Sequence, residues 1–166
     1  MPRTDIHSLS DASRIWLFGI SPALDEPKRA RMLQQVDLFL RDWAAHNVPV
    51  TSAREILHDS FLLIAVDQQS ETSGCSIDRM FGLLRQLERD LGVAILDPNM
   101  VFVRHGDGRV GAMTRDEFRA SGDMHTVVFD TLAERLGDVR GGRWERPAAE
   151  SWHARLLWSA AAAPPL

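Results

Sequence analysis

Phe61-Leu-Leu-Ile-Ala-Val66 is the longest unbroken apolar run in this chain of 166 residues. A short apolar run bounded by polar residues predicts a buried strand. Val50 to Leu57 precedes it as a second predicted strand, and His58-Asp-Ser60 leaves room only for a tight connection between the two. We therefore expect an antiparallel hairpin over 50–66.

Amphipathic helices are predicted on both sides of this hairpin. Asp25 offers an N-cap for the first helix, which we expect over about 26–46. Its apolar face repeats at helical spacing: Leu33, Val36, Leu40 and Trp43. The second helix is expected to begin near 76–77 and to end at Gly92, which supplies a left-handed stop. Its apolar face comprises Met80, Leu84, Leu87 and Leu91.

The order of elements predicts the fold class. A first strand is expected over Arg14 to Ile20, and a further strand after the second helix falls at either 93–96 or 100–104. Two helices on one face of an antiparallel sheet, in β-α-β-β-α-β order, form the ferredoxin-like arrangement. We therefore predict an α+β fold with a ferredoxin-like core.

The rest of the chain predicts an extension of this core. Strands are expected over 109–113 and 126–129, with a short helix near 115–120 and a final helix within 148–158. No internal repeat or second domain is evident. We expect one domain over 14–158, preceded by an N-terminal arm (1–13) and followed by a disordered tail (159–166).

Composition excludes several classes of function. The net charge of −4 argues against a nucleic-acid partner, and an apolar run of six residues is too short to span a membrane. The N-terminus lacks the apolar core of a signal peptide. The single cysteine, Cys75, fits a reducing compartment, so we expect a soluble cytoplasmic protein. A homodimer is one of the assemblies that the sequence allows.

The loop over 67–78 concentrates the reactive groups of the chain. Near a helix N-terminus the Cys75 thiolate would be favoured. For thiol chemistry the base would be His46 or His153, and the orienting carboxylate Asp78 or Asp67. The same helix start would bind a small anion through the residues that surround the thiol: Asp67, Ser73, Gly74 and Ser76. The alternative is that Cys75 is a buried structural residue, since free cysteines are among the most buried side chains.

Three tryptophans follow Gly142 in the C-terminal segment: Trp144, Trp152 and Trp158. They either clamp this segment onto the sheet or form an exposed surface for a protein partner, to which Trp152, His153 and Arg155 would belong. His105-Gly-Asp-Gly108 is typical of a hairpin turn. The scattered histidines match no metal-binding spacing, so we expect neither a metal nor another cofactor.

Several segments together resemble a bacterial family, common in Bacteroidetes, whose members are often labelled "ABC transporter ATPase". The most specific are Ala65-Val-Asp67 and Ser73-Gly-Cys-Ser-Ile-Asp78, supported by Trp43-Ala-Ala-His46 and by Glu150-Ser-Trp-His-Ala-Arg155. The resemblance covers about Arg14 to Leu157. It implies no catalytic residue that could be carried over to this chain.

The sequence leaves three hypotheses about function. The first is a small binding or interaction module for an anionic ligand or a protein partner. The second is a thiol-dependent enzyme or redox sensor that uses Cys75, with His46 or His153 as its base. An ATPase ranks last, because a Walker A loop needs a glycine-flanked lysine and the only lysine, Lys28, follows Glu26-Pro27.

Overall fold

The apolar run forms the central strand of a three-stranded antiparallel sheet. The computed structural model, which describes residues 3–160, orders this sheet β1 (Arg14–Gly19), β5 (Phe61–Val66) and β4 (Ser52–Leu57). All six residues of β5 are buried. The hairpin predicted over 50–66 is therefore confirmed, and so is the α+β class.

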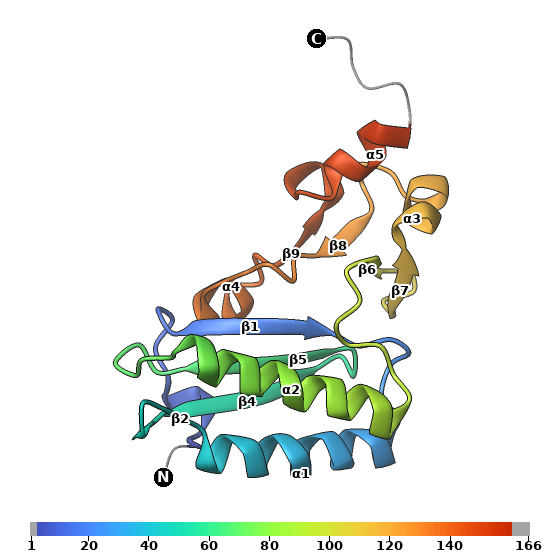
Figure 1. Ribbon diagram of the computed structural model, residues 1–166. Helices are drawn as coiled ribbons and strands as arrows, with labels where there is room; N and C mark the ends of the chain where they lie inside the picture. Colours follow the sequence, from blue (N-terminus) through green and yellow to red (C-terminus); the bar gives the residue numbers. More distant parts are fainter. Residues whose placement is uncertain (1–2, 161–166) are drawn as a thin grey trace.

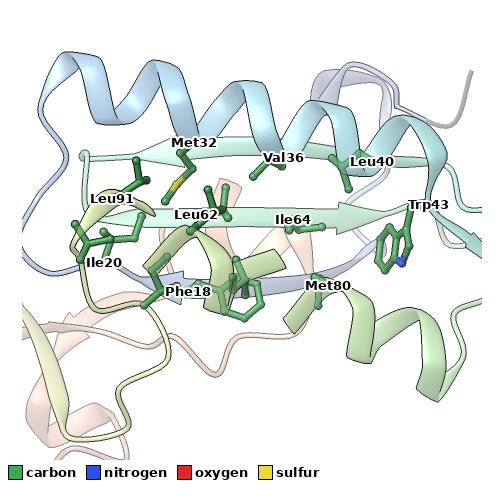
Figure 2. Close-up of a cluster of buried hydrophobic side chains, with 14 of the residues drawn as sticks. Phe18, Ile20, Met32, Val36, Leu40, Trp43, Leu62, Ile64, Met80 and Leu91 are labelled. Carbon is green, nitrogen blue, oxygen red and sulfur yellow. The ribbon is translucent and has the colours of Figure 1, made fainter. Parts of the chain in front are cut away.

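Two helices cover one face of this sheet (Figure 1). They are α1 (Glu26–Asp42), capped by Asp25, and α2 (Gly74–Leu91), capped by Ser73. Figure 2 shows Met32, Val36 and Leu40 of α1 pointing towards Leu62 and Ile64 of β5, which belong to the same buried cluster. Of the apolar face predicted for α1, Val36, Leu40 and Trp43 belong to this cluster, whereas Leu33 does not and Met32 is buried there instead.

The first helix ends earlier than predicted, at Asp42. Trp43 has an extended backbone, and its Nε1 donates a hydrogen bond of 2.8 Å to the carbonyl oxygen of Ser76. His46 and Asn47 then adopt positive φ angles in the turn of a miniature hairpin. Its strands are β2 (Ala44–Ala45) and β3 (Val48–Pro49). The end of α1 is therefore tied to the start of α2.

A second layer, built from the C-terminal half, packs against the other face of the first sheet through a shared buried cluster. Figure 1 shows its strands beyond β1. Its antiparallel sheet has the strand order β7-β6-β8-β9. The strands are β6 (Met100–Arg104), β7 (Val110–Thr114), β8 (Val127–Phe129) and β9 (Glu145–Pro147). The helices of this half are α3 (Arg115–Ser121), α4 (Leu136–Arg140) and α5 (Ala154–Ala160), with the 3₁₀ turn η2 (Ala148–Glu150).

Aromatic rings join the two layers. The ring centroid of Phe61 in β5 lies 5.0 Å from that of Phe102, 5.0 Å from that of Phe129 and 4.9 Å from that of Trp144. The same cluster includes Ile6 and Leu9, on and after the 3₁₀ turn η1 (Ile6–Ser8). Part of the predicted arm (1–13) is therefore buried against the sheet. Of the predicted tail (159–166), positions 161–166 lie outside the described residues.

Neither of the two segments proposed for a sixth strand joins the first sheet. Residues 100–104 form β6 of the second sheet, while 93–96 contribute only an antiparallel bridge between Ala94 and Ser21. At the other end of β1, Arg14 forms a bridge with Arg135. The outer edge of β1 is thus occupied at both ends, and the strand that a ferredoxin-like sheet would place there is missing from the described chain.

Candidate functional site

A cleft of about 890 Å³ lies beside the outer edge of β1, where the two layers meet. Leu17, Phe18 and Gly19 of β1 form one side of it. Other lining residues come from α2, from the segment that follows it, from β6 and from the C-terminal segment: Phe81, Arg85, Ile95, Leu96, Met100, Phe102, Arg115, Trp152 and Arg155. Most of these side chains are apolar, as is usual for a ligand site.

The segment 93–96 is held in place by α2. Gly92 ends that helix in the left-handed conformation, with φ of 65°. A carboxylate oxygen of Glu88 then accepts hydrogen bonds from the backbone N–H groups of Ile95 at 2.8 Å and Leu96 at 3.1 Å. This wall of the cleft therefore has its backbone donors satisfied, which gives it a defined shape.

Three arginines from separate parts of the chain lie around the cleft: Arg85, Arg115 and Arg155. None of them forms an ion pair within residues 3–160, whereas other arginines do, such as Arg54 with Asp37. Asp97 also lines the cleft, but its carboxylate accepts a hydrogen bond from the N–H of Asn99 at 2.9 Å, within its own turn. The formal charge around the cleft is therefore positive.

Two N–H groups at the cleft are buried without a partner. Nε of Arg115 and Nε1 of Trp152 both lack a hydrogen bond in the described part of the chain. The guanidinium carbon of Arg115 lies 5.6 Å from the centroid of the Trp152 ring. A buried donor without an acceptor costs about 1–3 kcal/mol, so an acceptor supplied by a ligand would stabilise this arrangement.

In the loop over 67–78, the polar side chains predicted to bind an anion instead form hydrogen bonds to the backbone of the loop itself. Ser73 Oγ accepts a hydrogen bond from the N–H of Ser76 at 3.1 Å, and Ser76 Oγ accepts one from the N–H of Ser73 at 2.7 Å. The two hydroxyls thus form a capping box for α2. Asp67 accepts a hydrogen bond from the N–H of Gln69, in a local turn. Gly74 has nothing within 4 Å of the position of a Cβ atom.

Cys75 is exposed in the first turn of α2. His46 is also exposed, in the β2–β3 turn beside the start of α2, and Asp78 is exposed on α2. Among the described residues, no hydrogen bond joins Cys75 to a histidine. Helix α2 contacts β2, which precedes the turn that carries His46, but no hydrogen bond in the described part of the chain aligns a histidine with the sulfur of Cys75.

His153 is not on a surface, which corrects one member of the predicted partner surface. Its side chain is 1% exposed, stacks on Trp152 at 3.9 Å between ring centroids, and has Nδ1 2.7 Å from Ser151 Oγ. Burial lowers the pKa of His153 from 6.5 to about 4, so the imidazole is neutral at pH 7. Trp152 and Arg155, its neighbours in the prediction, do line the cleft.

The other tryptophans of the C-terminal segment divide between the two predicted roles. Trp144 is buried in the cluster that joins the layers, whereas Trp158 is half-exposed. Arg85 and Arg115 were not predicted as site residues, because nothing in their local sequence distinguishes them from other surface arginines.

Two further findings concern cofactors and membranes. Over residues 3–160, no group of three or more His, Cys, Asp or Glu side chains is arranged to hold a metal ion. The helices of that same range include none with the length and apolar character needed to cross a bilayer.

Comparisons of the chain with protein-family models, with curated proteins and with solved structures gave no match in any of the three.

Proposed function

We propose that this chain is a binding module whose ligand is an anion with an apolar body, held in the cleft between the layers. The observation that carries the proposal is the position of Arg85, Arg115 and Arg155 around an apolar cleft, with no carboxylate partner among residues 3–160. An arginine beside low-dielectric walls binds a carboxylate or phosphate more strongly than one in open water. The proposal keeps the anionic ligand expected from the sequence and moves its site from the start of α2 to the cleft.

We also propose a fold type, a family relationship and a cellular location for this chain. The strand order β1-β5-β4, with both helices on one face, supports a ferredoxin-like unit that lacks its fourth strand. The resemblance to the bacterial family labelled "ABC transporter ATPase" remains a proposal that rests on the sequence segments alone. The exposed free thiol of Cys75 supports a cytoplasmic location, where thiols stay reduced.

A thiol-dependent activity is a second candidate, and the exposure of Cys75 favours it over a purely structural cysteine. The rate of alkylation by iodoacetamide as a function of pH tests it. An apparent pKa well below the ~8.5 of a free thiol would support the activity. An ordinary thiol pKa would remove it.

Calorimetric titration with 3-phenylpropionate tests the binding function, with 3-phenylpropionamide as the uncharged control. We expect the carboxylate to bind at least about tenfold more tightly than the amide, since a charge-assisted hydrogen bond contributes about 1.5–3 kcal/mol. Arg85→Gln and Arg155→Gln should each weaken binding by a similar factor. Both side chains are exposed, so these variants should fold normally.

The matched control is Arg31→Gln, an exposed arginine on α1 that lies outside the cleft. It should leave the affinity unchanged. Equal affinity for the acid and the amide, or equal losses for Arg31→Gln and Arg155→Gln, would contradict the proposal.

A further inference from the structure

The outer edge of β1 carries backbone groups that nothing in the described chain pairs. The N–H of Ile20 donates to Ser60, on the side of β5, whereas those of Ile15 and Ser21 donate to Glu134 and Ala94 on the outer side. Backbone groups alternate in direction along a strand. Leu17 and Gly19 therefore direct their N–H and C=O groups outwards, as Ile15 and Ser21 do.

The unpaired backbone groups of Leu17 and Gly19 lie at the wall of the cleft. Leu17 and Gly19 both line it, and no hydrogen bond to either outer N–H is found within residues 3–160. Figure 1 shows β1 as an edge strand of its sheet. The segment that joins α2 to β6 passes on the outer side of this strand. An unpaired strand edge is a ready template for another extended chain.

We infer that the ligand of the cleft is an acidic peptide segment that adds a strand to β1. This inference rests on the proposed function, because the same three arginines bind the carboxylates of the peptide. The unpaired stretch of the β1 edge ends at the bridge of Arg14 on one side and at the bridge of Ser21 on the other. At ~3.3 Å per residue, the edge between them accepts roughly four residues of extended chain.

The side chains of such a strand would alternate between two apolar walls. Phe18 lies on the helix side of the sheet, where Phe81 of α2 is the neighbouring aromatic wall. Leu17 and Phe102 lie on the side of the second layer. The cleft therefore offers apolar contact to both faces of an inserted strand, and the backbone of β1 offers hydrogen bonds to its edge.

Two other occupants fit these observations less well. A small anion would use the arginines and leave the N–H groups of Leu17 and Gly19 unpaired. A second copy of this chain, paired through its own β1 edge, would bring its own arginines into the cleft, and like charges at an interface are costly. An extended peptide with carboxylates satisfies both the backbone and the arginines.

The test uses acetylated tetrapeptides of the form apolar-Thr-apolar-Glu, with a free C-terminal carboxylate. The apolar positions are scanned through Val, Leu and Phe. Each peptide that binds is remade in two N-methylated forms, which block either of the two alternating sets of backbone N–H groups. One set would face β1 and the other would face away, so the two forms have the same charge and composition.

We expect one N-methylated form to bind at least about fivefold more weakly than the other, since two backbone hydrogen bonds are lost at about 0.5–1.5 kcal/mol each. At saturation with the parent peptide, exchange of the Leu17 and Gly19 amide hydrogens should slow by at least tenfold. Equal affinity of the two forms, or unchanged exchange at Leu17 and Gly19, would overturn the inference.

The outcomes separate this inference from the proposed function. If 3-phenylpropionate binds and no peptide does, the anion site stands and the added strand is wrong. If neither binds, both are wrong. If exchange at Leu17 and Gly19 slows as the concentration of the protein alone is raised, a second copy occupies the edge and the peptide is again excluded.

Discussion

The two layers of this molecule differ in how they are buried. In the first layer the central strand β5 is buried along its whole length, between two helices on one side and the second layer on the other. In the second layer every residue of the edge strand β7 is only half-buried. The largest aromatic side chains of β6, β8 and the segment before β9 pack onto the first layer instead: Phe102, Phe129 and Trp144.

This difference indicates a division of roles. The first layer has enough buried apolar surface to hold its own shape, whereas the second depends on contact with it. The candidate site lies at their junction, and its arginines come from α2 in the first layer and from the C-terminal half in the second. Changes that separate the layers should therefore alter the site.

The largest effect is expected from Phe61→Ala. This ring touches three aromatic rings of the second layer, and removal of a buried phenylalanine costs about 3–5 kcal/mol. Amide exchange should show faster opening in β6 and β8 than in β4. The control is Leu62→Ala, on the helix side of the same strand, which should loosen both layers together. Identical exchange patterns for the two variants would contradict the division between layers.

Burial of His153 in the second layer should make stability depend on pH between 6.5 and 4. Desolvation lowers its pKa to about 4, while Asp130 opposes this shift and Arg115 and Arg146 add to it. The unfolded chain binds the proton near pH 6.5 and the folded chain only near pH 4. The free energy of unfolding should therefore fall as the pH drops from 6.5 to 4, by up to about 3 kcal/mol.

Urea unfolding of the wild type and of His153→Gln, measured between pH 7 and 4, isolates this contribution. The variant should be less stable at pH 7, and the difference should shrink as the pH falls. Two parallel stability curves would show that His153 does not account for the loss.

Gly19→Ala should have an intermediate effect. A Cβ atom at this position would overlap the ring of Phe102, so the second layer must shift away from β1. Overpacking of this kind costs about 1–3 kcal/mol. Addition of Phe102→Leu should recover part of the loss. Gly82→Ala is the control, because nothing lies near its Cβ position in α2, and it should stabilise by up to about 1 kcal/mol. A loss at Gly19 that Phe102→Leu does not reduce would contradict this explanation.

The smallest effects compare one ion pair in each layer. Arg54 binds Asp37 through two hydrogen bonds of 2.8 and 2.9 Å, and Arg104 binds Glu145 through two of 2.5 and 3.0 Å. The arginine hydrogen bonds hold the pKa of each carboxyl below its usual value. Asp37→Asn and Glu145→Gln should each cost about 1 kcal/mol at pH 7.

The fold favours the charged form of the Asp37 and Glu145 carboxyls, whereas it disfavours the charged form of His153. The stabilisation is complete above the ordinary values of 3.8 for Asp37 and 4.5 for Glu145, and it disappears as the pH falls through the lowered values. Thermal unfolding at pH 7 and at pH 3 should show the cost of each substitution shrinking at the lower pH. A cost that is the same at both values would exclude the ion pair as its source.

Local patterns were sufficient to predict much of the first layer. The hairpin, the two helices and β1 follow from apolar runs and helical spacing within windows of about 20 residues. The predicted extension of the first helix to 46 was wrong, because Trp43 leaves the helix to bond to Ser76. Helix α4 and strand β9 were missed, since five and three residues carry little periodicity.

The second layer and the site depend on tertiary contacts that no local pattern reveals. The sequence predicted a strand at 93–96 or 100–104, but it could not show that 100–104 joins a different sheet. Arg85, Arg115 and Arg155 are far apart in sequence and meet only because the layers pack together. Trp152 and Arg155 were predicted as part of a surface because they are near neighbours in the chain.

The central claim is that the ligand binds in the cleft beside β1. Titration of ¹⁵N-labelled protein with 3-phenylpropionate, followed through the backbone amides, tests it most directly. The account predicts the largest chemical-shift changes at Gly19, Leu96 and Arg115, with little change at Gly74 and Cys75. Changes centred on Gly74 and Cys75 would place the anion at the start of α2 and would contradict the claim.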